Sequence, residues 1–235
     1  MRILASPIVF NEDRKIGSVL QRFTPGLVDK VLVMNDGSTD GSVKVARDLG
    51  VEVLSHDRQL GVGAAIRTVL RYAQGQGFDV VVILAGNDKD RPTEIPLLIK
   101  PIREEGCDLI QGSRYLSGGA SGGMPFYRKL ATRIHPWLFS LFAGQRITDS
   151  TNGFRAIRLS LLDDPRINLD QEWLDKYELE PFLLFKALKL GYKVTEVTVT
   201  KIYPPKHLGY TKMKPVTGWW SILRPIFLLG FGIKK

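Results

Sequence analysis

Short apolar runs and segments of helical periodicity alternate along the first half of the chain. The apolar runs predict five buried strands, over residues 3–10, 30–34, 51–54, 80–85 and 108–111. Between these runs, apolar residues at helical spacing predict four helices, over residues 14–23, 40–49, 63–74 and 93–104. Strands that alternate with helices through short connections indicate an α/β fold, in which helices flank a mostly parallel sheet.

The second half of the chain has a different pattern. A glycine-rich stretch at 116–125 predicts a loop that either closes over a substrate or lies exposed in solvent. The elements predicted after it are an aromatic-rich helix over 126–142, a short strand over 152–158, a helix over 177–190 and a final strand over 193–202. Ligands of open α/β sheets bind at the carboxyl ends of the strands, so we expect a site in the loops after Val9, Met34 and Ala85.

The basic residues of the chain are unevenly distributed. Its 235 residues carry a formal net charge of +9, from 33 Lys and Arg against 24 Asp and Glu. Residues 109–148 contain five basic side chains and no acidic ones, and residues 197–235 contain seven basic side chains and no acidic ones. The excess charge therefore lies in these two stretches. Such stretches bind nucleic acids, anionic membranes or phosphorylated ligands.

Large apolar side chains accompany both basic stretches, and this favours a membrane surface over a nucleic acid as the partner. Trp219 and Trp220, near Lys and Arg, are typical of a segment at a membrane interface; the alternative is a C-terminal helix packed on the core. We therefore predict a domain over residues 1–215 and an amphipathic segment over 216–235. The single cysteine, Cys107, excludes an internal disulfide framework. Since neither a signal peptide nor a long apolar run is evident, we expect a cytoplasmic protein attached peripherally to the cytoplasmic face of a membrane.

Polar motifs follow the first two predicted strands. One is Pro-Ile-Val-Phe-Asn-Glu at residues 7–12, and the other is Asn-Asp-Gly-Ser-Thr-Asp at residues 35–40. An acid at a strand end, such as Asp36, can accept hydrogen bonds from a ribose or a base edge, and Gly37 would let the backbone approach the ligand closely. A plain turn followed by a helix N-cap is the alternative for the second motif.

A third motif, Gly-Val-Gly-Ala-Ala-Ile-Arg at residues 61–67, opens a predicted helix. It lacks the third glycine of a dinucleotide-binding motif and does not follow the first strand, so the two glycines indicate little by themselves. Arg67 lies on the first turns of that predicted helix, where it either reaches a phosphate or remains exposed to solvent.

Two carboxylates follow the hydrophobic strand predicted at 80–85. Asp88 and Asp90 are two positions apart, so their side chains converge if the backbone is still extended there. Hard divalent cations bind through one or two such carboxylates together with substrate phosphates, and they stabilise charge on a departing diphosphate. A polar turn ahead of the next helix is the alternative. The three histidines share no ligand spacing, so we assign them no role.

Taken together, these strand-end motifs resemble the donor-binding half of family-2 glycosyltransferases, which have the Rossmann-like GT-A fold. The motifs that narrow the resemblance to the dolichyl-phosphate mannose synthase branch are Gly-Ser-Arg at 112–114, Gly-Met-Pro-Phe-Tyr-Arg-Lys-Leu at 123–130 and Thr-Asp-Ser-Thr-Asn-Gly-Phe-Arg-Ala at 148–156. The resemblance extends from about Ile3 to Val199. It departs from the family pattern at one position, because the first Asp of the D-x-D motif is Gly86 here.

The resemblance implies an inverting, metal-dependent transfer of a sugar from a GDP- or UDP-sugar to a polyprenyl phosphate, with Mg²⁺ or Mn²⁺ as the cofactor. The positions that it implies for nucleoside binding are Pro7, Phe10, Glu12 and Asp36, and to these the motifs add Gly37 and Arg67 on the donor side. The metal ligands that it implies are Asp88 and Asp90. The positions that it implies for holding the acceptor and donor phosphates are Arg114, Arg128 and Thr132.

A phosphate acceptor is consistent with the chemistry of these residues. A phosphate monoester, with a second pKa of about 6, is largely ionised near neutral pH and attacks without a general base. We therefore predict that Asp88, Arg114 and Arg128 act in catalysis by positioning the phosphates and neutralising charge. Two alternatives remain open. One is a glycosyltransferase acting on a saccharide or lipid hydroxyl with Asp149 as the catalytic base, and the other is a non-catalytic protein that binds a nucleotide-sugar or a lipid phosphate.

Overall fold

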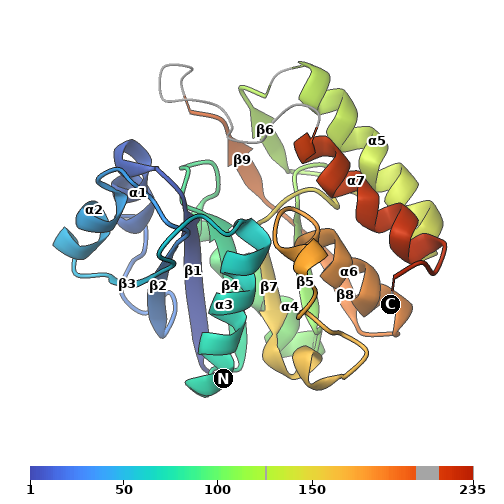
Figure 1. The fold of residues 1–235 in the computed structure, drawn as a ribbon, viewed down its shortest axis with the longest axis horizontal. Helices are drawn as coiled ribbons and strands as arrows, with labels where there is room; N and C mark the ends of the chain where they lie inside the picture. Colours follow the sequence, from blue (N-terminus) through green and yellow to red (C-terminus); the bar gives the residue numbers. More distant parts are fainter. Residues whose placement is uncertain (125, 205–216, 235) are drawn as a thin grey trace.

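A seven-stranded sheet forms the centre of the protein (Figure 1). The computed structural model describes residues 1–124, 126–204 and 217–234. The strands of this sheet are β1 (Ile3–Val9), β2 (Lys30–Asn35), β3 (Glu52–Ser55), β4 (Val80–Ala85), β5 (Leu109–Ser113), β7 (Arg155–Arg158) and β8 (Val194–Thr198). They lie in the order β3-β2-β1-β4-β7-β5-β8, and β7 runs antiparallel to β4 and β5 while the other pairs are parallel.

Helices cover both faces of this sheet. The helices are α1 (Asp13–Leu20), α2 (Ser42–Asp48), α3 (Val62–Gly75), α4 (Ile95–Glu105), α5 (Phe126–Ala143), α6 (Leu179–Lys189) and α7 (Thr217–Gly230), with 3-10 turns at Pro92–Glu94, Leu159–Asp163 and Glu172–Leu174. Leu4 and Val81 belong to the core that includes α3 and α6, whereas Ala5 and Val82 belong to the core that includes α1 and α4. Because both faces are covered, the strands are nearly continuous apolar runs, which is the pattern that predicts this α/β fold.

The predicted α/β fold is confirmed, and the structure differs from the prediction in the last predicted strand. The predicted final strand over 193–202 is broken in two, so β8 stays in the main sheet and β9 (Thr200–Ile202) leaves it. β9 pairs in parallel with β6 (Ala120–Gly122), which lies within the predicted glycine-rich loop. The Ile202 N–H donates to the carbonyl oxygen of Lys89 at 3.1 Å. This bond holds β9 beside the loop that follows β4.

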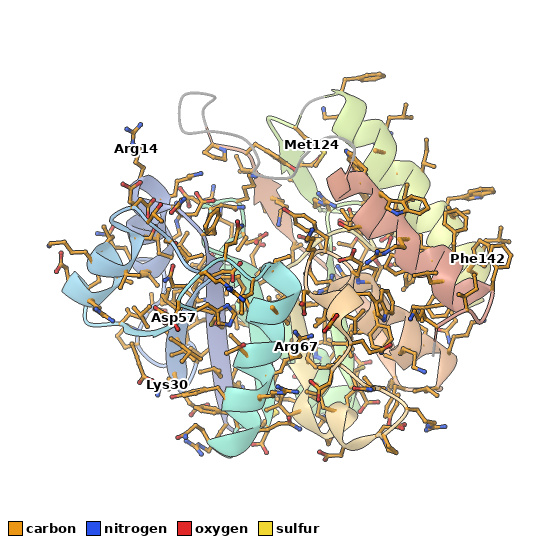
Figure 2. All side chains as sticks on the ribbon, in the orientation of Figure 1. Arg14, Lys30, Asp57, Arg67, Met124 and Phe142 are labelled. Carbon is orange, nitrogen blue, oxygen red and sulfur yellow. The ribbon has the colours of Figure 1, made fainter. Side chains whose placement is uncertain are left out.

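The C-terminal helix α7 packs against the domain beside α5 (Figure 1). Ile226 of α7 is buried in the core that includes α6. Phe142 of α5, labelled in Figure 2, lies edge-on to Phe227 of α7. The described part of the segment 216–235 is therefore packed on the core, and the predicted boundary after residue 215 lies outside the described residues. Among the described helices, none has the length and apolar character needed to cross a bilayer.

A buried histidine joins α5 to α7. Nε2 of His135 lies 3.1 Å from the carbonyl oxygen of Ile222, to which it donates, and Nδ1 lies 2.7 Å from the hydroxyl of Ser150, from which it accepts. Burial lowers the pKa of His135 to about 4, so the ring is neutral at neutral pH. This histidine has a structural role that its sequence context does not indicate.

Candidate active site

A cavity of about 500 Å³ opens at the carboxyl ends of β1 and β4. The strand order reverses here, because β2 and β3 lie on one side of β1 and β4 lies on the other. Ligands of open α/β sheets bind at such a point. The cavity wall includes the segment after β1, the loop after β4, and Trp219 and Ile222 of α7. Its position agrees with the prediction of a site in the loops after Val9, Met34 and Ala85, since Asp36, just after β2, also lines it.

Three of the residues predicted to bind the nucleoside line this cavity. They are Phe10, Glu12 and Asp36. The Glu12 carboxylate forms an ion pair of 2.5 Å with Lys15 on the first turn of α1. The fourth residue, Pro7, is buried within β1 and is not among the described residues that line the cavity. The end of β1 therefore supplies an aromatic ring and a paired carboxylate, while Pro7 supports the strand.

The Asp36 carboxylate holds a segment of chain beside the cavity. Its two oxygens accept hydrogen bonds of 2.9 Å from the N–H groups of Leu60 and Gly61. Oδ1 of Asp36 also lies 2.8 Å from Nδ1 of His56, a second histidine with a structural role. Asp36 therefore fixes residues 56–61, and a contact between this carboxylate and a nucleoside stays a prediction.

The glycines of the second and third motifs make room for neighbouring backbone. Gly37 has a φ of 70°, and a Cβ at this position would overlap with the backbone of Arg58. A Cβ at Gly63 would overlap with the carbonyl oxygen of Leu174, because residues 174–176 lie across the first turn of α3. In the structure the group that approaches the backbone of Gly37 closely is the chain itself, and a close approach of a ligand there stays a prediction.

Arg67 binds this neighbouring segment rather than the cavity. Its guanidinium donates to the carbonyl oxygen of Leu169 at 2.9 Å and forms an ion pair with Asp175; its place on α3 is labelled in Figure 2. Arg67 is not among the described residues that line the cavity. The structure therefore does not agree with the predicted phosphate contact, because Arg67 joins α3 to residues 169–175.

Arg114 and Asp149 form a buried ion pair beside the cavity. Nε and Nη2 of Arg114 donate to the two carboxylate oxygens of Asp149 at 2.6 and 2.7 Å, and Nη2 also donates to the hydroxyl of Thr151 at 2.7 Å. Burial alone would lower the pKa of Arg114, but the adjacent Asp149 carboxylate outweighs burial and raises that pKa. Since Arg114 lines the cavity, the pair holds a guanidinium in a fixed position there.

The geometry of Asp149 does not suit the alternative role of general base. Asp149 is 0% exposed, both of its oxygens are engaged by Arg114, and it is not among the described residues on the cavity wall. The N–H groups of Asp149 and Thr148 donate to the Glu196 carboxylate at 2.9 and 2.7 Å. Burial raises the pKa of that Glu196 carboxyl. The Asp149 carboxylate therefore holds the Arg114 guanidinium in place.

Thr132 joins Arg114 on the cavity wall. Its Oγ1 lies 2.5 Å from the phenol oxygen of Tyr115. The Tyr115 ring contacts the guanidinium groups of Arg114 and Arg133, whose carbons lie 5.4 and 5.7 Å from its centroid. Arg128 lies on α5, but its side chain is outside the described part of the structure. The structure thus brings together two of the three predicted phosphate-binding residues.

The two predicted metal ligands contact different basic residues. Asp88 has a φ of 61°, so the extended backbone on which convergence depends is interrupted, and its carboxylate forms an ion pair with Arg22. Asp90 is 1% exposed, accepts the N–H of Ala85 at 3.0 Å and forms an ion pair of 2.6 Å with Lys201. Among the described residues, no three carboxylate, histidine or cysteine side chains are grouped for a metal. With each carboxylate already neutralised, this donor set does not fit a divalent cation.

Sequence reasoning missed the residues that the end of the chain brings to the cavity. Lys201 and Tyr203 reach it from β9 and the residue after it, and Trp219 and Ile222 reach it from α7. Lys201 belongs to the basic stretch at 197–235, which is the only signal that the sequence offers for it. The Val/Thr alternation over 193–202 predicts one continuous strand. Nothing in it indicates the break between β8 and β9, after which Lys201 lies at the cavity.

The chain matches the family described as Glycosyl transferase family 2 over residues 8–164. The undecaprenyl-phosphate mannosyltransferase of Micrococcus luteus is 30% identical over 223 residues, which cover 91% of this chain and 88% of the relative. The dolichyl-phosphate hexose transferase of Haloferax volcanii is 29% identical over 220 residues, which cover 92% of this chain and 89% of the relative. The resemblance seen in the motifs is therefore confirmed.

Solved structures share the fold. Glucosyl-3-phosphoglycerate synthase from Mycobacterium tuberculosis, in complex with Mg²⁺ and UDP, has a TM-score of 0.71 and 22% identity, covering 100% of this chain and 80% of that chain. The same enzyme in complex with Mn²⁺ and UDP-glucose has a TM-score of 0.70. At this identity the likeness concerns the GT-A fold alone. Because the family match spans more than half of its length, the chain belongs to glycosyl transferase family 2 and is a glycosyltransferase of GT-A fold.

Proposed function

We propose that this glycosyltransferase transfers a hexose from a nucleotide-sugar to a polyprenyl phosphate. The observation that carries the proposal is the buried Arg114–Asp149 pair, which fixes a guanidinium on the cavity wall. A planar guanidinium suits a phosphate group, and the apolar side chains of Trp219 and Ile222 on the same wall suit an isoprenoid chain. The M. luteus and H. volcanii relatives are named for undecaprenyl phosphate and dolichyl phosphate, which supports this acceptor class.

A phosphate acceptor suits a site in which Asp149, the residue predicted as the alternative base, is held by Arg114. One acceptor oxygen forms a bond to C1 of the sugar, the bond from C1 to the diphosphate breaks, and its electron pair stays on the diphosphate oxygen. In-line attack from the opposite face inverts the configuration at C1. Because the phosphate is already ionised, no proton has to be removed. Asp149 can therefore remain paired with Arg114 throughout the reaction.

The leaving nucleoside diphosphate needs positive charge beside it. The solved neighbours that hold Mg²⁺ or Mn²⁺ argue for a divalent cation. The ion pairs of Asp88 with Arg22 and of Asp90 with Lys201 argue for a different source of charge in this chain. The proposed reaction therefore takes this positive charge from the chain itself.

An apolar stripe on α5 supports attachment to a membrane surface. The exposed side chains of this stripe are Phe126, Leu130, Ile134, Trp137 and Leu141, which lie on one face of the helix. Exposure reaches 80% for Phe126 and 69% for Trp137, and Trp220 on the adjacent α7 is 56% exposed. Lys129 and Arg133 of α5 add positive charge. We propose that this face lies on an anionic membrane at its cytoplasmic side, where a lipid acceptor is available to the cavity.

A transfer assay with the full-length protein tests the proposed reaction. A panel of GDP- and UDP-hexoses is incubated with a short polyprenyl phosphate, and the matching free polyprenol serves as a second acceptor. We expect a glycosylated polyprenyl phosphate in the mass spectrum. Arg114→Lys keeps a charge opposite Asp149 but loses the bidentate fork, and should lower transfer by about tenfold or more while donor binding is retained. Transfer only to the polyprenol would support the hydroxyl alternative, and donor binding without transfer would support a binding protein.

Vesicle flotation tests the membrane face. Full-length protein should float with vesicles that contain anionic lipid, and Trp137→Ser/Leu141→Ser should reduce the bound fraction, since each lost apolar side chain removes about 1.5–3 kcal/mol of burial. The matched control is Leu97→Ser, because Leu97 is a 48% exposed residue on α4. Equal flotation of the double variant and the wild type contradicts the assignment of this face.

A further inference from the structure

Two buried lysines lie on the cavity wall at the end of β4. Nζ of Lys201 lies 2.6 Å from Oδ1 of Asp90 and 2.9 Å from Oδ1 of Asn152. Lys89 is 6% exposed, and its Nζ lies 4.5 Å from the centroid of the Tyr203 ring. Both lysines line the cavity. Because β9 is hydrogen-bonded to the loop that carries Lys89, the two ammonium groups belong to one connected unit.

Packing keeps a further carboxylate out of this end of β4. Gly86 stands where the family pattern has the first Asp of D-x-D. A Cβ at Gly86 would lie 2.5 Å from Cγ2 of Val9 and 3.1 Å from the carbonyl oxygen of Ile8. Val9 is buried and its β-branched side chain is stiff, so neither group can move aside without disturbing β1. The missing carboxylate is therefore excluded by the structure around it.

The charge balance here differs from that of a metal site. Asp88 forms an ion pair with Arg22 and Asp90 forms one with Lys201. The cavity wall includes the two lysines, Lys89 and Lys201, whereas neither carboxylate is among the described residues that line it. A divalent cation would have to displace Arg22 and Lys201 from their carboxylates, and it would meet the like charge of Lys89 on the same cavity wall. An anion would instead be attracted by the ammonium groups of Lys89 and Lys201 on that wall. The end of β4 is therefore suited to a phosphate group rather than to a metal.

We propose that Lys89 and Lys201 bind the diphosphate of the nucleotide-sugar and neutralise the leaving nucleoside diphosphate in place of a divalent cation. This inference rests on the proposed function and adds the source of positive charge to it. When the bond from C1 to the diphosphate oxygen breaks, the electron pair stays on that oxygen. The two ammonium groups donate hydrogen bonds to the diphosphate and keep their protons. Lysine acts as a point charge toward phosphate in this way in other proteins.

Calorimetric titration of the full chain with UDP and with GDP, in EDTA and in Mg²⁺ or Mn²⁺, tests the inference. For the nucleotide that binds, the Kd in EDTA should stay within about threefold of its value in Mg²⁺. Asp90→Asn/Lys201→Met changes both members of the buried pair, so no unpaired charge is left in the core. This double variant should weaken binding by about tenfold or more in both buffers. Lys89→Met leaves that pair intact and should weaken binding to a similar extent.

A surface pair provides the matched control. Lys44 and Asp48 of α2 form an ion pair of the same length, 2.6 Å, but their side chains are 79% and 59% exposed. Asp48→Asn/Lys44→Met should bind the nucleotide as the wild type does. Thermal unfolding of each variant shows whether it is folded, and Lys89→Met carries the test if the buried double variant is not.

Two results overturn the inference. One is nucleotide binding that is lost in EDTA and restored by Mg²⁺ or Mn²⁺, and the other is a wild-type Kd in the folded lysine variants. In both cases transfer to a polyprenyl phosphate is still measurable, so the proposed function is judged separately. Failure to bind any nucleotide refutes the inference and the proposed function together.

Discussion

Replacing Asp149 with Asn tests the buried ion pair on which the proposed site depends. The substitution keeps the shape of the side chain but removes the charge opposite Arg114. It also replaces one carboxylate oxygen, which accepts a hydrogen bond from Arg114, with an NH₂ group that cannot accept one. The guanidinium then remains almost fully buried, at 3% exposure of its side chain, without its counter-charge. We expect a folded but clearly destabilised protein with weakened sugar transfer.

The magnitude follows from the burial of both partners. Removing one member of a buried ion pair costs about 3–5 kcal/mol, against a total stability of about 5–15 kcal/mol for a domain. At about 2–4 °C per kcal/mol for a chain of this size, the midpoint of thermal unfolding should fall by roughly 6–20 °C. Arg114→Met/Asp149→Asn removes both charges. Its loss in free energy of unfolding should therefore be smaller, by about 1–3 kcal/mol, than the summed losses of Arg114→Met and Asp149→Asn.

Urea unfolding, followed by circular dichroism for the wild type, both single variants and the double variant, gives this coupling energy. Donor binding, measured in parallel, should be retained in Asp149→Asn. A base that serves only to take a proton from a hydroxyl would have little effect on stability. Additive single-variant effects, or a loss below about 1 kcal/mol in Asp149→Asn, would therefore refute the positioning role.

Further predictions concern the packing around the site. The folded-state pKa of His135, about 4, lies below its ordinary value of 6.5, so the unfolded chain takes up a proton first as the pH falls. The free energy of unfolding of the wild type should therefore fall by about 3 kcal/mol between pH 6.5 and 4. Urea unfolding across that range should show no such contribution in His135→Gln. Gly63→Ala places a Cβ against the carbonyl oxygen of Leu174 and should lower the unfolding midpoint strongly. Gly75→Ala, at the open end of the same helix, should leave the midpoint unchanged or raise stability by up to about 1 kcal/mol; equal effects of the two glycine variants would contradict the packing described for α3.

The sequence predicts most of the fold because the signals for it are local. A strand covered on both faces is an apolar run, and β4 is found at residues 80–85, where the run predicts it. The signals for the C-terminal ends of helices are equally local. Gly50, Gly77 and Gly106 have φ values of 73°, 67° and 70°, as expected for glycines after helix C-termini.

The contacts that shape the site are not local, and this is why the sequence does not predict them. Lys201 meets Asp90 across 111 positions, and Arg67 meets Asp175 across 108. Both arginine and lysine fit a phosphate contact by residue type, and only the fold decides whether a carboxylate of the chain or a ligand is beside them. The resemblance to the family identifies the enzyme class, but not the ion pairs that Asp88 forms with Arg22 and Asp90 forms with Lys201.

The most direct test of the central claim is the mass of the lipid product formed by the full-length protein from a nucleotide-sugar and a polyprenyl phosphate. The proposed function predicts a polyprenyl phosphate heavier by one hexose residue, together with release of the nucleoside diphosphate. Release of free hexose, or transfer to free polyprenol with the polyprenyl phosphate unchanged, would contradict it.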